Sequence, residues 1–266
     1  MLSVDDGRAL LNTVLTEDDP RPGLWELVDS GFADHFIPEL TALKLEQDPI
    51  HKHKDVLAHT IAVTGQTRAD LTLRMAALFH DIAKPQTRKI DADGVTFRHH
   101  EAVGAKMVRA RLRELGYEER FLLDVKELVR LSGRFKGFAD GWSDSAVRRY
   151  ARDAGHLLGL LNELVRADCT TRHEHKRVEL HSHVDEIEAR ILKLAEEDRI
   201  AAERPLIDGD AVMARFKPCS PAAIAAVVSW LADNEPLEAW DPRNVLRGPA
   251  IAKELKLLQS PSLLET

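Results

Sequence analysis

The adjacent pair His80-Asp81 stands out in this sequence because it interrupts the apolar stretch RMAALFHDIAK. Histidines and acids in buried positions need partners, since burying an unpaired polar or charged group is costly. Neighbouring residues on a helix point about 100° apart, so the two side chains can converge on an ion that lies beside the helix. Imidazole and carboxylate together suit Mn, Fe, Ni, Co or Zn, and further ligands must then come from elsewhere in the chain.

Two other residues could supply those ligands. His59 lies in DVLAHTI, about one helical hairpin upstream, and Asp168 lies in NELVRADCTTR, another apolar segment with helical spacing. Each residue alone has an ordinary interpretation, because most acids on helices are solvated and most lone histidines are not ligands. The order His, His-Asp, Asp on successive predicted helices is more specific, and it predicts a divalent-metal site made by all four residues.

Four more side chains could bind a substrate beside that metal. Lys84 follows His80 by one helical turn, so its cation could hold a phosphate oxygen, although a lysine that favours the helix dipole is an equal alternative. His100 begins another predicted helix, where an imidazole could ligate a metal, orient a substrate or protonate a leaving group, although an exposed histidine at a helix start is the ordinary alternative. Arg149 and Arg172 could line a phosphate-binding mouth, although arginines on helices are usually solvated.

The elements around these residues are predicted to be helices, because apolar residues recur at helical spacing and alternating runs are nearly absent. Helices are expected at 52–66 and 70–84, the second ended by Pro85, and a small hairpin is expected from TRKI and VTF. Other helices are expected at 7–16, 23–31, 100–115, 118–131, 143–153, 155–170 and 174–203. Gly116 should end the helix that starts at His100. The fold class is therefore all-α, with a break at Pro205.

The composition limits the function. The chain has 266 residues, 44% hydrophobic and 30% charged, so a packed core is expected. Its formal net charge of −7 argues against a broad nucleic-acid-binding surface, although the 37 Lys and Arg residues allow basic patches. Two cysteines without metal-ligand spacing argue against a disulfide framework. The acidic N-terminus and the lack of an apolar run of roughly 20 residues predict a cytoplasmic protein without a membrane span.

Several stretches resemble a known family. The segment from Gly23 to Leu206 resembles the HD-domain half of bacterial CCA-adding tRNA nucleotidyltransferases, especially the actinobacterial type. The matching stretches are LVDSGFADHFIPEL, HKHKDVLAHTIAV, LRMAALFHDIAKPQTR, VTFRHHEAVGAKMVRARLR, WSDSAVRRYARDAG and ELVRADCTTR. The resemblance implies an HD-domain helical bundle, divided into neck-like helices at 1–48, the HD domain at 49–204 and a small helical tail at 205–266.

The resemblance also implies a site. In HD phosphohydrolases the motif His, His-Asp, Asp binds a divalent ion, which gives the same four ligands and leaves Mg, Mn, Ni, Co, Fe and Zn open. Lys84 and His100 correspond to the family's lysine after His-Asp and to its histidine before glutamate. The HD half of these enzymes is associated with phosphatase, 2′-nucleotidase and 2′,3′-cyclic phosphodiesterase activity. The implied substrate is a nucleotide or an RNA 3′ end, with tRNA as a further partner.

Two departures from the family pattern affect the expected activity. No Gly-rich segment with paired acids on a strand is found in these 266 residues, so we expect no CCA addition by this chain. The family's LHLRFH reads LSGRFK here, so Ser132 and Lys136 replace both histidines and a single-metal site is expected. The sequence thus predicts a metal-dependent HD-type phosphohydrolase. The alternatives are a non-catalytic tRNA-binding body or subunit of a tRNA nucleotidyltransferase and, with less support, an HD hydrolase of deoxynucleotides or alarmones.

Overall fold

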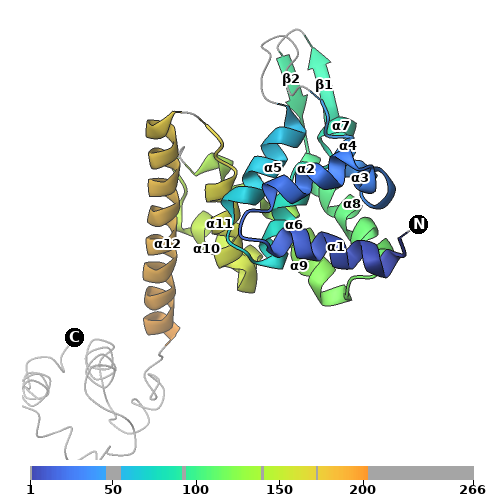
Figure 1. The fold of residues 1–266 in the computed structure, drawn as a ribbon. Helices are drawn as coiled ribbons and strands as arrows, with labels where there is room; N and C mark the ends of the chain where they lie inside the picture. The colour runs from blue at the N-terminus through green and yellow to red at the C-terminus, as the bar shows by residue number, and fades with distance from the viewer. Residues whose placement is uncertain (1, 46–54, 92–93, 139–140, 172, 203–266) are drawn as a thin grey trace, which may run out of the picture. The chain divides into compact units, whose positions relative to one another are not determined.

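The computed structural model describes residues 2–45, 55–91, 94–138, 141–171 and 173–202. Over these residues the chain is helical apart from one two-stranded antiparallel hairpin, which confirms the all-α prediction (Figure 1). One compact unit of the chain covers Met1–Leu194. The expected tail at 205–266 lies outside the described residues, and the domain limits at 48 and 204 stay predictions.

The N-terminal helices cover one side of the helices that carry the predicted site. Their bounds are α1 (Val4–Thr16), α2 (Arg21–Asp29), α3 (Phe32–Phe36) and α4 (Pro38–Thr41). Ser3 and Asp6 form a capping box at the start of α1. In the packed domain α1 contacts α6 and α2 contacts α5. The helices predicted at 7–16 and 23–31 are thus confirmed with slightly different ends, whereas α3 and α4 were not predicted.

The helices α5 (Val56–Gln66) and α6 (Leu71–Phe79) carry the first predicted site residues. Asp55 and Asp70 begin them by accepting hydrogen bonds from backbone N–H groups in the first turn of each helix. Every residue from Leu73 to Phe79 is buried, because α6 packs against α1, α5, α9 and α11. Because α6 is covered on all sides, it fixes the position of His80 and Asp81, which follow it directly.

Arg74 fixes the start of α6 to the N-terminal helices. Its side chain is buried, and its guanidinium donates hydrogen bonds to the carbonyl oxygens of Leu15 at 2.8 Å and Asp18 at 3.2 Å. Carbonyl groups at the end of a helix lack partners within that helix, so a buried cation can satisfy them. Arg74 also donates to the carbonyl of Thr67, in the turn before α6. The position of α6 is therefore set by hydrogen bonds as well as by apolar packing.

The predicted helix at 70–84 is wrong at its end, because α6 stops at Phe79. His80 is its C-cap residue, and the chain forms a turn before the short helix α7 (Lys84–Thr87). Pro85 lies in the first turn of α7, where the missing N–H group of proline costs nothing. Pro85 therefore helps to start a helix here and does not end one.

The small hairpin is confirmed. Its strands are β1 (Arg88–Asp91) and β2 (Gly94–Phe97), paired antiparallel with Arg88 opposite Phe97. Figure 1 shows the hairpin projecting from the helical body. After β2, His99 adopts a left-handed conformation with φ 62°, so the chain reverses and α8 (His100–Glu114) starts directly at His100. The hairpin thus ends beside the first residue of α8.

The remaining helices also follow the sequence pattern closely. They are α9 (Glu119–Leu131), η1 (Arg134–Gly137), α10 (Asp144–Ala154), η2 (Gly155–Leu157), α11 (Leu158–Ala167) and α12 (Glu174–Ala202). Gly116, with φ 72°, follows α8 as predicted. The single helix expected at 155–170 is instead the turn η2 followed by α11. Within the described ranges, none of the helices combines the length and apolar character that crossing a membrane requires.

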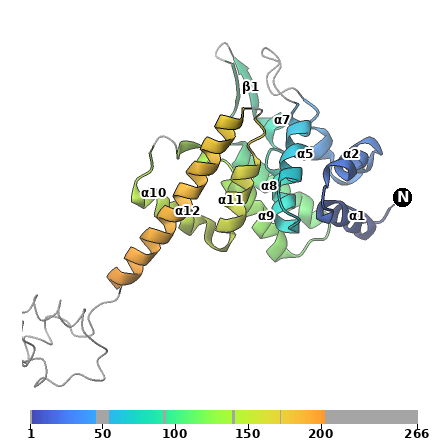
Figure 2. The same cartoon turned by 60° about the vertical axis from the view of Figure 1, so that its left-hand side comes forward.

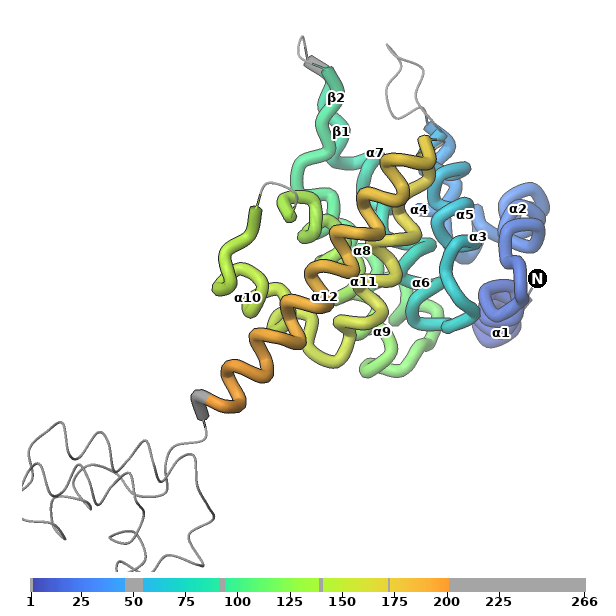
Figure 3. Tube along the Cα trace, turned by 90° about the vertical axis from the view of Figure 1, so that its left-hand side faces the viewer, coloured from blue at the N-terminus to red at the C-terminus, as the bar shows by residue number. Residues whose placement is uncertain are grey.

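A polar network fixes α12 on α10 and α11 (Figures 2 and 3). The Tyr150 hydroxyl donates to the buried Asn162 side chain at 2.7 Å, and the Asn162 amide donates to Glu188 of α12 at 2.9 Å. Arg166 donates to Glu188 and to Asp185 at 2.7 and 2.6 Å. Because every member has a partner, the network can be buried at little cost and holds α12 in one register.

Candidate metal centre

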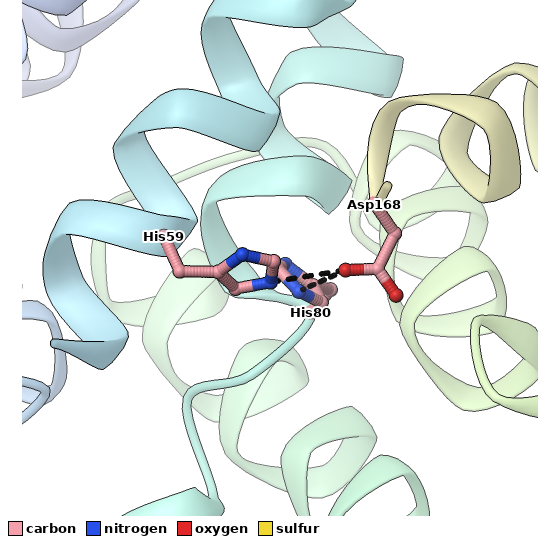
Figure 4. Close-up of side chains that lie close together, drawn as sticks. All are labelled: His59, His80 and Asp168. Carbon is pink, nitrogen blue, oxygen red and sulfur yellow. Dashed lines mark hydrogen bonds and ion pairs between the residues drawn. The ribbon is translucent and has the colours of Figure 1, made fainter. Parts of the chain in front are cut away.

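Three predicted ligands meet at the ends of three helices (Figure 4). His59 lies on α5, while His80 and Asp168 are the C-cap residues of α6 and α11. The Oδ1 atom of Asp168 lies 3.0 Å from Nε2 of His59 and 3.4 Å from Nε2 of His80. Within the part of the chain that the structure describes, one ligand atom from each of these residues lies within 4.8 Å of the others. This cluster fits a divalent-metal site.

Asp81 borders the same cluster. Its Oδ2 atom lies 3.1 Å from Nε2 of His80 and 3.7 Å from Nε2 of His59. The sequence pattern placed Asp81 on the same helix as His80, but the chain has left α6 at this point. The two side chains converge because Asp81 lies in the turn that follows the helix. The structure thus brings all four predicted ligands together, and their role as ligands stays a prediction.

The outer nitrogens of both histidines have fixed partners. Nδ1 of His80 donates to the carbonyl oxygen of Ala77 at 2.7 Å, and Nδ1 of His59 forms a hydrogen bond of 2.9 Å with the Thr170 hydroxyl. Such contacts orient an imidazole and direct its other nitrogen toward a metal. Thr170 was not singled out from the sequence. Its position two residues after Asp168 was a usable signal, since the chain turns back toward α5 there.

Two buried atoms of the cluster have charged neighbours but no well-formed hydrogen bond. They are Nε2 of His80 and Oδ2 of Asp81, which lie 3.1 Å apart in side chains that are 4% and 3% exposed, and Oδ2 also lies 2.6 Å from Nζ of Lys84. Because Nδ1–H of His80 is donated to Ala77, Nε2 faces this carboxylate with a lone pair unless it carries a proton or binds an ion. A divalent ion bound by both atoms would satisfy them, and one nitrogen with one carboxylate oxygen is a suitable donor set. The residues present therefore fit the metal that the sequence pattern predicts.

A contact between helix ends holds Asp168 near His59. The side-chain amide of Gln66, the last residue of α5, donates to the carbonyl oxygen of Ala167 at 2.9 Å. Ala167 is the last residue of α11, so this bond also satisfies a free helical carbonyl. Asp168 follows directly and is the more exposed ligand, with 39% of its side chain accessible against 12% for His59. The cluster is thus open to solvent on the Asp168 side.

Lys84 and His100 both approach Asp81 from outside the cluster. Lys84 reaches back from α7, with Nζ 2.6 Å from Oδ2 of Asp81 and 5.5 Å from the centre of the Phe97 ring. The predicted placement of Lys84 on the helix face of His80 is wrong, because the two residues belong to different helices. His100 donates from Nδ1 to the Phe97 carbonyl at 2.7 Å, and its Nε2 lies 3.5 Å from Oδ1 of Asp81.

The two predicted arginines have different outcomes. Arg149 is exposed on α10 and forms no hydrogen bond or ion pair with the cluster, so its substrate-binding role stays a prediction. Arg172 lies outside the described residues.

Glu101, which was not singled out from the sequence, has its carboxylate 3.4 Å from Nδ1 of His100 and 3.6 Å from Nζ of Lys136. It links the cluster's neighbour His100 to the turn after α9.

The charges of the cluster are strongly coupled. Burial of the His80 imidazole disfavours its charged form, but the Asp81 and Asp168 carboxylates outweigh this and raise the pKa of His80 to about 10. Burial alone would raise the pKa of Asp81, yet His80 and Lys84 hold it well below its usual range. Burial lowers the pKa of His100, so this imidazole is neutral at physiological pH. A metal ion would therefore compete with a proton on His80.

We predict that Asp81→Ala loses the metal without unfolding. The substitution removes the buried carboxylate nearest to His80, so bound metal should fall from about one equivalent to less than a tenth in protein purified without a histidine tag. Circular dichroism should show unchanged helicity. Asp29→Ala, at an exposed acid in the last turn of α2, is the matched control and should keep its metal. Equal metal content in Asp81→Ala and the parent protein would refute the assignment.

A second prediction concerns pH. A ligating imidazole must be neutral, so below pH 10 metal binding should release the His80 proton, and affinity should rise with pH by up to about tenfold per unit. The raised pKa also means that charged His80 stabilises the metal-free fold below about pH 6.5, an effect lost as the pH rises through 10. Calorimetric zinc titrations in buffers of different ionisation enthalpy count the protons. The control His156→Gln changes an exposed histidine and should release as many protons as the parent protein. If the parent protein releases no proton when zinc binds, the proposed competition between metal and proton at His80 is wrong.

Comparison with known proteins agrees with this geometry. The family model described as "HD domain" matches residues 56–203. The chain is 31% identical to the A-adding tRNA nucleotidyltransferase of Deinococcus radiodurans, over 77% of this chain and 48% of that protein. It is 33% identical to the CC-adding tRNA nucleotidyltransferase of Thermus thermophilus, over 72% of this chain and 43% of that protein. It thus spans less than half the length of these relatives. The chain belongs to the HD domain family and is similar to these tRNA nucleotidyltransferases over about three quarters of its own length.

Proposed function

We propose that this domain is a metal-dependent phosphohydrolase that cleaves phosphomonoesters or cyclic phosphodiesters of a nucleotide or an RNA 3′ end. The observation that carries the proposal is that the buried Nε2 of His80 faces carboxylate oxygens of Asp81 and Asp168, at 3.1 and 3.4 Å, in a cluster that could hold a metal ion. A divalent ion held by His59, His80, Asp81 and Asp168 would polarise a phosphoryl oxygen and activate water for attack. Membership of the HD domain family supports this chemistry.

The chain's own residues would orient the substrate. Asp168 forms the accessible edge of the cluster, so a phosphate group would approach from that side. Lys84 holds the Asp81 carboxylate and keeps a positive charge beside the reacting oxygens. His100 presents a neutral Nε2 beside Asp81, since its Nδ1–H is bonded to Phe97, and this nitrogen could accept a proton from the attacking water and then return it to the leaving group.

The relatives support the substrate class. Both are named for tRNA and for nucleotide transfer, so a nucleotide or an RNA terminus is the closest chemistry for this chain. Action on tRNA is part of the proposal for the same reason. The net charge of −7 favours a substrate bound at a local site over one bound across a broad surface.

A tRNA-binding body without chemistry is the weaker alternative. A binding surface for RNA needs exposed cations and stacking groups. It has no need for two histidines and two carboxylates that converge in one place, with His80 and Asp81 more than 95% buried. Burying such groups without a function would only cost stability.

The direct test is hydrolysis by metal-loaded protein. Homogeneous protein with Mg, Mn, Co, Ni or Zn should release phosphate from nucleoside 2′- or 3′-monophosphates, or open nucleoside 2′,3′-cyclic phosphates, with at least one ion. Asp81→Ala gives the background rate. If no ion and no substrate in this set exceeds that background, the proposed activity is wrong and the tRNA-binding alternative gains support.

Lys84 and His100 should affect turnover but not metal content. Lys84→Ala removes a cation beside the reacting phosphate, and the loss of one such contact is expected to slow turnover about a hundredfold. His100→Ala should flatten the acid side of the pH dependence of turnover, because burial lowers the pKa of this imidazole and moves its charge change to more acidic pH. Lys106→Ala, at an exposed lysine of α8, serves as the control. If His100→Ala loses the metal as Asp81→Ala does, His100 is a ligand and not a substrate-side residue.

A further inference from the structure

A cavity of about 250 Å³ opens beside the metal cluster and shares Asp168 with it. Its wall comes from three elements that are distant in sequence. Lys136 and Phe135 lie in η1, Val165 lies in α11, and Leu180 and His183 lie in α12. The Asp168 carboxylate turns Oδ1 toward the histidines, and Figure 4 shows its other oxygen pointing away from them. A ligand in the cavity would therefore lie next to the outer edge of the metal site.

The cavity has a polar end and an apolar wall. Lys136 supplies its ammonium group, with 65% of the side chain exposed, and Asp168 supplies a carboxylate that already contacts both histidines. Phe135, Val165 and Leu180 supply apolar surface. Small-molecule sites usually combine apolar lining with a few convergent polar groups, in volumes of roughly 300–1,000 Å³. A slightly smaller cavity has room for one nucleotide-sized group and not for a longer segment.

Glu101 contacts both Lys136 and His100. One oxygen of its carboxylate is 3.6 Å from Nζ of Lys136, and the other is 3.4 Å from Nδ1 of His100. His100 in turn contacts Asp81. A continuous row of side chains thus connects the cavity with the buried ligand of the metal cluster.

Gly133 makes room for that carboxylate. A Cβ atom at this position would lie 2.0 Å from Oε1 of Glu101, which is far too close for two atoms that are not bonded. The backbone there has φ −85°, which any residue adopts, so an alanine at this position would be accommodated by moving the Glu101 side chain. Gly133 and Lys136 lie in the stretch LSGRFK, where the sequence also departs from the related pattern LHLRFH.

We propose that this cavity binds the phosphate-bearing terminal residue of a nucleotide, with Lys136 holding a phosphate oxygen and Glu101, seated against Gly133, positioning Lys136. The inference rests on the proposed function for the role of the metal and adds the group that recognises the substrate. The phosphate lies between Lys136 and the metal cluster, and the nucleoside lies along Val165 and Leu180. The ammonium group of Lys136 would attract a phosphate more strongly than a neutral group.

The test measures binding, so it does not depend on turnover. Inorganic phosphate and 3′-deoxy-3′-(phosphonomethyl)adenosine, in which a CH2 group replaces the scissile oxygen, are titrated into manganese-loaded protein by calorimetry. Lys136→Met should weaken both probes roughly tenfold while metal content stays at the parent level. Lys106→Met is the matched control and should bind as the parent. Leu180→Ala should weaken the phosphonate and leave inorganic phosphate unchanged.

The role of Glu101 is tested by a double-mutant cycle. Gly133→Ala should weaken both probes severalfold, because its methyl group displaces Glu101. The same substitution in a Glu101→Ala background should have no further effect. Equal losses in both backgrounds would overturn the positioning role of Glu101.

The results separate this proposal from the proposed function. Parent-like binding by Lys136→Met, or an equal loss in Lys106→Met, overturns the phosphate site even if the protein hydrolyses phosphoesters. If the probes bind in a Lys136-dependent way but the protein hydrolyses no phosphoester, the phosphate site is supported and the proposed phosphohydrolase activity is wrong. Unchanged phosphonate binding in Leu180→Ala overturns the placement of the nucleoside.

Discussion

The arrangement of the site depends on one energetically unfavourable feature, the burial of the Asp81 carboxylate directly after the enclosed helix α6. Asp81 is 3% exposed, and a carboxylate in such a place needs compensating charge or hydrogen bonds. Its oxygens face nitrogen atoms of His59, His80, Lys84 and His100 at 2.6 to 3.7 Å. These four residues come from α5, the end of α6, α7 and α8. These elements thus meet around a single carboxylate, and displacing any of them would remove one of its four partners.

The residue types of the site were predictable from the sequence, but the route of the chain around them was not. His59, His80, Asp81 and Asp168 stand out because each is polar in an apolar segment. The end of α6 at Phe79 was missed because Ile82 and Ala83 are buried in the turn, so apolar residues continue past the helix at helical spacing. Hydrophobic periodicity cannot separate a buried helix from a buried turn that follows it. The position of Lys84 was wrong for the same reason.

Contacts made through tertiary packing could not be found by spacing at all. Glu101 packs against Gly133 and contacts Lys136, although Glu101 and Lys136 are 35 positions apart in the chain. Arg166, two residues before Asp168, looks suited to phosphate in the sequence. The network with Glu188 and Asp185 of α12 engages its guanidinium, which raises its pKa further and directs it away from the site. The helices and the hairpin depend on local sequence patterns and were therefore predicted well. Which side chains pair with each other depends on how the helices pack, and this cannot be predicted from local patterns.

The same charges explain how metal and phosphate would depend on each other. Asp81 and Asp168 are balanced by Lys84 and by the proton on His80 before a metal binds, so the cluster is close to neutral. A divalent ion would replace that proton and give the cluster a net positive charge, while burial keeps His100 neutral. A dianionic phosphate would then meet a positive site with Lys136 at its edge, whereas the metal-free cluster offers it little attraction. Because the Asp168 side is the accessible one, the ion and the phosphate would share one entrance, and the metal has to bind first for the phosphate to gain from it.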